Sequence, residues 1–302
     1  MHIGVDLGGT KIETALLDKA GTVRFRHRVA APQQDYNATV AAVAALVKQA
    51  DSISKDMASV GIGIPGTISP ATGLVKNANS TWLNGQPLDR DIESALGRPV
   101  RIANDANCFA LSEAVDGAAE GAHTVFGVIL GTGVGGGMVV DGRVLTGANA
   151  IAGEWGHNPL PWPEAAEMPG PACWCGRRGC IETWVSGPAL ARTHLESTKQ
   201  ALDAAEIADR AAAGDTQAMK SLARYEERLA RALAHMINIF DPDIIVLGGG
   251  LSNIPRLYEN LPRLWGKWIF SDRVATRITP PRHGDSSGVR GAAWLWREDS
   301  GH

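Results

Sequence analysis

One pattern of strands and glycine turns occurs twice in this chain. Near the N-terminus, the stretches "MHIGVDL", "KIETALLD" and "TVRFRHRV" predict three strands, with "GGT" joining the first two. About 125 residues later, "TVFGVIL", "GTGVGGG" and "MVVDGRVL" predict a strand, a glycine turn and a hairpin with Asp141-Gly142 at its tip. The repetition favours two related α/β domains that flank a cleft. The alternative is a pair of unrelated hairpins.

The rest of the pattern fits this α/β organisation. We expect further strands in "SVGIGIPG", "PVRIAND" and "IIVLGGG", a helix over residues 35–50, and a long helix through the apolar stripe from Leu222 to Phe240. A last helix in "SGVRGAAWLW" is expected to fold back on the first domain. The predicted domains are residues 1–118, joined by 287–297, and residues 119–286.

Composition excludes several classes of protein. A hydrophobic content of 44% and a charged content of 20% are typical of a soluble globular chain, and a net charge of −3 argues against a nucleic-acid partner. We expect no membrane segment, because no apolar run is long enough, and no signal peptide, because a strand pattern starts at once. Four cysteines in 302 residues favour a reducing, cytoplasmic location.

Three glycine turns follow predicted strands, at residues 8–9, 131–137 and 248–250. Glycines let a backbone approach an anion closely, and ligands of α/β sheets bind at the carboxyl ends of strands. Neither a Walker A loop nor a dinucleotide-binding loop is present, because the required spacing or the following helix is missing. The three turns therefore indicate phosphate binding of another kind, and a single turn would be explained by chain reversal alone.

Six motifs in order make the resemblance specific: "DLGGTK", "ANDANC", "LGTGVGGG", "GEWGH", "CWCGRRGCIE" and "DPDIIVLGGG". The chain resembles the ROK family of bacterial sugar kinases from residue 1 to about residue 297. The resemblance implies a duplicated actin-like fold, shared by sugar kinases, Hsp70 and actin. "KNANSTWLNGQP" and "HGDSSGVRGAAWLW" are most similar to the fructokinase (mannokinase) branch, while "NDANCFALSEA" is similar to the N-acetylglucosamine kinases.

Phosphoryl transfer to an alcohol needs a base near the hydroxyl, and Asp105 is the candidate. Asp105 stands where a strand ends and a helix begins, so an N-cap role is the alternative reading. The resemblance favours catalysis and makes Asn104 and Asp105 a substrate-binding pair. It also implies sugar-hydroxyl binding by Glu154, His157 and Glu182, with Asn79 as a weaker candidate.

ATP is the expected phosphoryl donor, with Mg²⁺ as its cation. The resemblance places Asp6 near the magnesium, through water, and Lys11 near the terminal phosphates, although Lys11 could equally be a solvated surface residue. The adenosine is expected near Gly248. The full set of expected nucleotide-binding residues is Asp6, Gly8, Gly9, Thr10, Lys11, Gly131, Thr132, Gly133, Gly135, Gly136, Gly248, Gly249 and Gly250.

Three of the four cysteines lie within eight positions, after His157. A disulfide is disfavoured by the reducing location and by the strained ring of Cys-x-Cys, and the Cys-x-x-Cys of redox sites is absent. His157, Cys173, Cys175 and Cys180 instead match a Cys₃His structural zinc site. Such a site would orient His157 and Glu182. The Trp- and Pro-rich segment before Cys173 is interpreted as a covering flap, and Cys108 as a buried small residue.

The expected activity is transfer of the γ-phosphate of ATP to the 6-hydroxyl of a hexose. Fructose is the first expected substrate and mannose the second, with N-acetylglucosamine or glucose as the alternative. A sugar-responsive repressor of the same family is disfavoured, because we expect no N-terminal DNA-binding module. An actin-like filament or structural ATPase would need neither the Asn104-Asp105 pair nor the cysteine cluster. A homodimer is expected from the resemblance.

Overall fold

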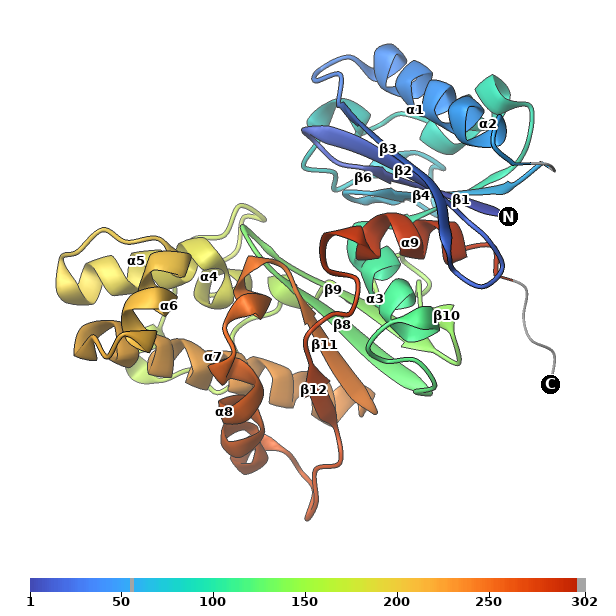
Figure 1. The fold of residues 1–302 in the computed structure, drawn as a ribbon. Coiled ribbons are helices and arrows are strands. Elements are labelled where there is room, and N and C mark those ends of the chain that lie inside the picture. Colours follow the sequence, from blue (N-terminus) through green and yellow to red (C-terminus); the bar gives the residue numbers. More distant parts are fainter. Residues whose placement is uncertain (55–56, 298–302) are drawn as a thin grey trace. The chain divides into compact units, whose positions relative to one another are not determined.

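The computed structural model describes residues 1–54 and 57–297, which form two compact units (Figure 1). The first unit contains residues 1–121, 137–152 and the C-terminal part from residue 282, and the second contains residues 122–136 and 153–281. This division differs from the expected domains because residues 137–152 pack with the first unit. Within the described residues, no helix is long and apolar enough to cross a membrane.

The first unit is built on a five-stranded sheet of order β3-β2-β1-β4-β7. The first three strands form an antiparallel meander, and β4 and β7 continue the sheet in parallel with β1. The elements are β1 (His2–Leu7), β2 (Lys11–Leu17), β3 (Val23–Ala30), α1 (Tyr36–Asp51), β4 (Ser59–Ile64), β5 (Thr67–Ile68), β6 (Val75–Lys76), η1 (Thr81–Leu83), α2 (Leu88–Leu96), β7 (Val100–Asn104) and α3 (Asp105–Asp116).

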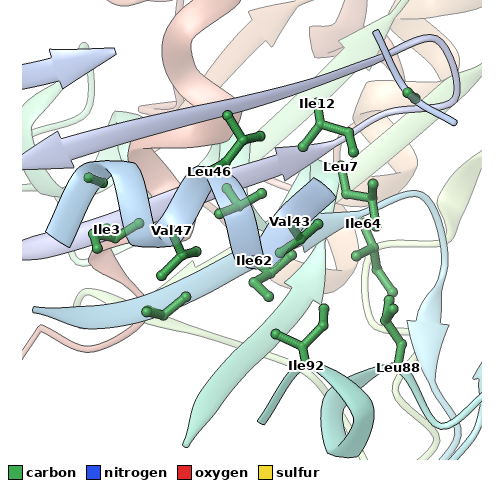
Figure 2. Close-up of a cluster of buried hydrophobic side chains, with 14 of the residues drawn as sticks. Ile3, Leu7, Ile12, Val43, Leu46, Val47, Ile62, Ile64, Leu88 and Ile92 are labelled. Carbon is green, nitrogen blue, oxygen red and sulfur yellow. The ribbon is translucent and has the colours of Figure 1, made fainter. Parts of the chain in front are cut away.

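Alternation along β1 explains how this sheet is covered. Successive side chains of a strand point to opposite faces, so Ile3, Val5 and Leu7 share one face with Ile62 of β4. Figure 2 shows Ile3, Leu7 and Ile62 among side chains of α1 and α2 in the main core of the unit. The residues labelled there are Ile3, Leu7, Ile12, Val43, Leu46, Val47, Ile62, Ile64, Leu88 and Ile92.

The opposite face of the sheet carries glycines, and helix α9 (Ser287–Trp294) packs directly on them. A Cβ atom on Gly4 would lie 1.9 Å from the carbonyl oxygen of Val289, and one on Gly61 would lie 1.8 Å from that of Ala292. Helix α3 packs on the other side of α9, where Gly291 meets the backbone of Cys108. Small residues at these positions let α9 lie close to the sheet on one side and close to α3 on the other.

The second sheet has the order β10-β9-β8-β11-β12. Strands β8, β11 and β12 run parallel, and β9 and β10 form an antiparallel hairpin. Asp141 and Gly142 at the hairpin tip both have positive φ, as the sequence predicts for Asp-Gly in a two-residue turn. The strands are β8 (Thr124–Leu130), β9 (Val134–Val140), β10 (Arg143–Val144), β11 (Ile244–Gly248) and β12 (Arg277–Thr279).

The two sheets share one order, with three consecutive strands followed by two that extend the sheet in parallel. Two unrelated hairpins would not reproduce the later strands as well, so the sequence repeat reflects a duplicated topology. Helices of the second unit are α4 (Glu182–Val185), α5 (Gly187–Thr198), α6 (Ala204–Ala212), α7 (Thr216–Phe240) and α8 (Arg256–Trp265), with single 3₁₀ turns η2 (Trp155–His157), η3 (Ala165–Glu167), η4 (Gly250–Asn253) and η5 (Gly266–Trp268). The 3₁₀ turn η6 (Gly284–Ser286) belongs to the first unit.

Candidate functional site

Asp105 is the first residue of α3 and directly follows β7. Its predecessor Asn104 is the N-cap, because the Asn104 side chain accepts a hydrogen bond from the Ala106 N–H at 2.9 Å. Oδ1 of Asp105 shares that donor at 2.8 Å. The alternative reading of Asp105 as the cap is therefore wrong, since Asn104 fills that role. The Asp105 side chain is exposed on this unit, where a ligand can reach it.

The first glycine turn joins β1 to β2 and is closed by a hydrogen bond from the Gly8 N–H to the Lys11 carbonyl. Thr10 and Lys11 are exposed beside it. Asp6 lies near the end of β1, opposite Glu13 of β2. Burial raises the pKa of Asp6 to about 6, and the Glu13 carboxylate adds to this effect. A nearby cation would stabilise the ionised form of this carboxylate, which is compatible with the expected position of Asp6 near Mg²⁺.

Asn79 lies at the surface, shortly before η1. Its neighbour Ser80 is buried, and the hydroxyl of Ser80 would be 3.0 Å from a Cβ atom on Gly9. The chain around residue 80 thus packs against the first glycine turn. Because Ser80 occupies that space, position 9 has little room for a side chain.

The second glycine turn is shorter than the sequence suggests. It covers Gly131, Thr132 and Gly133, whereas β9 begins at Val134 and already contains Gly135 and Gly136. The expectation of a turn through residue 137 is therefore wrong. Gly136 is needed inside the strand because a Cβ atom there would lie 2.7 Å from the Trp155 ring.

The third glycine turn follows β11 and opens η4. Gly249 has a φ of +80°, and a Cβ atom on it would lie 2.4 Å from the Leu130 carbonyl oxygen at the end of β8. The second and third turns thus lie next to each other, at the carboxyl ends of two parallel neighbouring strands. Their exposed backbone is suited to an anionic ligand. Gly248 itself is the last residue of β11.

His157, Cys173, Cys175 and Cys180 converge, with one ligand atom from each lying within 4.8 Å of all the others. The Cys175 and Cys180 sulfurs are 3.7 Å apart, and Nδ1 of His157 is 3.6 Å from the Cys173 sulfur. A tetrahedron around zinc, with bonds of about 2.0–2.3 Å, has edges of roughly 3.5–3.8 Å. Burial and the neighbouring thiols raise the pKa of Cys180 to about 12, so a bound cation is what would make this sulfur a thiolate.

Glycines shape the loops of this cluster. Gly176 and Gly179 both have positive φ, at +86° and +69°, and they turn the chain on either side of "RR". Cys173 and Arg177 are joined by a backbone hydrogen bond across the loop. The Cys-x-Cys-x₄-Cys spacing thereby folds into one compact knuckle. Cys108 lies apart in α3 and is fully buried.

Glu154 and His157 bracket one 3₁₀ turn, η2, as their spacing predicts. Between them the buried Trp155 donates its indole N–H to the Gly135 carbonyl at 3.0 Å, which ties η2 to β9. Glu154 is exposed, and His157 is half-buried. Because Nδ1 of His157 points at the three cysteine sulfurs, its other ring nitrogen, Nε2, can form a hydrogen bond elsewhere.

Glu182 begins α4, two residues after the last cysteine. Its Oε2 accepts a hydrogen bond from the Val134 N–H at 3.0 Å, and its Oε1 accepts one from the Trp174 indole at 2.8 Å. A side chain at position 133 would displace this carboxylate, because a Cβ atom there would lie 2.7 Å from Oε2. One carboxylate therefore joins the cysteine knuckle to the second glycine turn.

The segment expected to form a flap is anchored by a buried carboxylate. Glu167 of η3 accepts hydrogen bonds from Arg228 at 2.7 Å and from Arg231 at 2.8 Å, both on α7. Burial raises the pKa of Glu167, but the two guanidinium groups outweigh it and lower the pKa to about 2. Arg231 also donates to the Trp162 carbonyl. A covering function of this segment stays a prediction.

The whole chain can be compared with known proteins. The model of the ROK family matches residues 2–299. The chain belongs to the ROK family. It is 41% identical over 300 residues to an N-acetyl-D-glucosamine kinase from Yersinia enterocolitica, and the match covers 98% of this chain and 99% of that protein.

Solved structures of the family agree with the fold. The ROK hexokinase from Thermus thermophilus is 32% identical with a TM-score of 0.86, over 97% of both chains. A ROK glucokinase from Streptomyces griseus, in complex with glucose and AMPPNP, is 29% identical with a TM-score of 0.76, over 97% of this chain and 98% of that one. The expected α/β fold of the sugar kinases, with its duplicated sheet topology, is confirmed.

Sequence reasoning missed two groups in this ROK chain. Trp174 was passed over because an exposed tryptophan between two cysteines carries no signal of its own. Glu167, Arg228 and Arg231 were missed because their partners lie more than sixty positions away. The buried charges on α7 were the available signal, since a charge on the apolar face of a helix needs a partner.

Proposed function

We propose that this protein is an ATP-dependent sugar kinase that phosphorylates the 6-hydroxyl of a hexose, with N-acetyl-D-glucosamine as its preferred substrate. The relative with 41% identity over nearly the full length carries that activity in its name. Fructose, the first substrate expected from the sequence, is replaced by the alternative, because the motifs similar to fructokinases are short compared with this full-length similarity. Hexose specificity depends on pocket details that short motifs do not encode.

Asp105 acts as the general base, and its place in the fold is the observation that carries the proposal. The helix start is capped by Asn104, so Asp105 is not required as the cap and its exposed carboxylate can accept the proton of the 6-hydroxyl. Asn104 and Asn79 offer amide groups that both donate and accept hydrogen bonds, which suits sugar hydroxyls.

Glu154, His157 and Glu182 hold the other hydroxyls of the sugar. Carboxylates accept charge-assisted hydrogen bonds, and His157 keeps Nε2 for the sugar because its Nδ1 is the atom beside the Cys173 sulfur. The four-residue cluster fits zinc in ligand type and spacing. With all four positions filled by protein ligands, its contribution is to orient His157 and Glu182 rather than to take part in the chemistry.

The glycine turns hold the phosphates of ATP through their backbone N–H groups. Gly8, Gly9 and Thr10 form one such turn, and the turns that start at Gly131 and Gly249 form the others, with the adenosine near Gly248 and Gly250. Lys11 adds a positive charge close to the first turn. Asp6 is the residue that would hold Mg²⁺, through water, and the cation would offset the negative charge of the transferred phosphoryl group.

A coupled kinase assay tests the proposal with four sugars: N-acetylglucosamine, glucose, mannose and fructose. We expect the highest kcat/KM with N-acetylglucosamine and a 6-phosphate product. A preference for fructose would restore the substrate first expected from the sequence. Failure to transfer phosphate from ATP to any of the four would refute the proposed function.

A further inference from the structure

Trp174 lies between the two metal-ligand positions Cys173 and Cys175 and is 73% exposed. Despite this exposure, its indole makes two defined contacts. Its N–H donates to Oε1 of Glu182 at 2.8 Å, and its ring meets the His157 ring edge-on, with 4.9 Å between centroids and 85° between planes. Both contacts fall on residues that the proposed function assigns to the sugar.

The indole N–H has a specific consequence for Glu182. Oε2 of this carboxylate is occupied by the Val134 N–H, and Oε1 is held by Trp174. The Cys173 sulfur lies 4.0 Å from Oε1 but has no proton to donate once it binds a metal. With a donor on each oxygen, the carboxylate cannot rotate, and each oxygen keeps a lone pair for a sugar hydroxyl.

We propose that Trp174 is a positioning residue of the sugar site, an inference that rests on the proposed function. Its indole N–H sets the orientation of the Glu182 carboxylate, and its ring restrains the His157 imidazole. Because the residues on both sides of Trp174 bind the metal, the cluster fixes the backbone that presents the indole. Metal binding and sugar binding are thereby coupled through one side chain.

Two substitutions separate the parts of this role. Trp174→Phe keeps an aromatic ring beside His157 and removes the N–H, whereas Trp174→Ala removes both. The matched control is Trp296→Phe, which likewise removes an indole N–H, here one that donates to the Val60 carbonyl and not to Glu182. Each variant is purified as the full chain, and its zinc content and Tm are measured before the kinetics.

For Trp174→Phe we expect the KM for the sugar to rise about tenfold, since one hydrogen bond to a charged group is lost. The KM for ATP, the zinc content and the Tm should match wild type. Trp174→Ala should raise the sugar KM further, and Trp296→Phe should leave it unchanged. In a Glu182→Gln background, where the held carboxylate is gone, Trp174→Phe should change sugar affinity less than about twofold.

An unchanged sugar KM in Trp174→Phe would overturn the inference. The inference also fails if the tenfold effect persists in the Glu182→Gln background, or if it comes with loss of zinc and a lower Tm, because Trp174 would then act only on the structure. These outcomes differ from failure of the proposed function, in which the wild-type protein itself phosphorylates none of the sugars.

Discussion

The Glu182 carboxylate accepts a hydrogen bond from the backbone N–H of Val134, with 3.0 Å between Oε2 and the nitrogen. This contact connects the helix that follows the cysteine knuckle to the strand that follows the second glycine turn. A candidate sugar-binding residue thus contacts the backbone of the residue that directly follows Gly133, in the turn that the proposed function assigns to phosphates. The position of Glu182 depends on both.

Replacing Gly133 with alanine tests this dependence. A Cβ atom at position 133 would lie 2.7 Å from Oε2 of Glu182, so the carboxylate must move. We expect Gly133→Ala to raise the sugar KM about tenfold. The control is Gly131→Ala in the same turn, where a Cβ atom would meet nothing within 4 Å. Equal sugar KM values for the two variants would show that Glu182 is not the cause.

Asp105→Asn should lower kcat by about 10³-fold, as expected for loss of a general base. The Tm should change little, because Asn104 supplies the cap of α3 and asparagine can still accept the hydrogen bond from Ala106. Steady-state kinetics and thermal unfolding measure the two effects. Asp272→Asn, a change at an exposed aspartate of the other unit, serves as the control. Turnover close to wild type would remove Asp105 as the base.

Metal removal should affect stability and sugar binding together. We expect about one zinc ion per wild-type chain, and Cys175→Ser and Cys180→Ser should each lose it. Loss should lower the Tm and weaken sugar affinity roughly 10-fold or more, because His157 and Glu182 are no longer oriented. Cys108→Ser should keep its zinc, since Cys108 lies outside the cluster. If a chelator strips the metal and leaves both properties intact, the positional role is wrong.

Because of Glu167, the free energy of unfolding should decrease at acid pH. Its pKa is lowered from 4.5 to about 2, so the unfolded state takes up a proton at higher pH than the folded state. The stabilisation from this group, roughly 3 kcal/mol, is full above pH 4.5 and is lost as the pH falls toward 2. Glu167→Gln should therefore lower the free energy of unfolding at pH 7 and flatten its decrease between these pH values.

Urea unfolding at several pH values measures this effect. Glu196→Gln is the control, because Glu196 is 68% exposed and its i,i+4 pair with Arg192 should contribute less than about 1 kcal/mol. The assignment fails if the two variants have the same stability at pH 7.

Much of the fold could be predicted because local patterns determine it. The alternation of Ile3, Val5 and Leu7 with smaller residues predicted β1 and its buried face, and Asp141-Gly142 predicted the hairpin. The start of β9 was missed because glycines usually indicate turns. Gly136 lies within the strand because a larger residue there would collide with Trp155. The residues next to Gly136 in the sequence do not indicate this contact.

The candidate site also contains features that the sequence predicts and features that it does not. The convergence of His157 with three cysteines could be predicted because cysteines at short spacing after a histidine match the ligand pattern of structural zinc sites. The Trp174–Glu182 contact could not, because hydrogen bonds between surface side chains leave no periodic pattern. Likewise, a carboxylate at a helix start fits both a cap and a base. The hydrogen bond from the Ala106 N–H to the Asn104 side chain identifies Asn104 as the cap, and the role of Asp105 as the base stays a prediction.

Helix α9 has a consequence for how the protein is made. The sheet of the first unit is completed by α9, which lies on Gly4 and Gly61 although it comes from the far end of the chain. During synthesis, the strands of residues 2–104 are made before residues 287–294, so α9 can cover this face only after most of the chain has been produced. The unit that carries Asp105 is therefore finished late, although its first strand is the first to be synthesised.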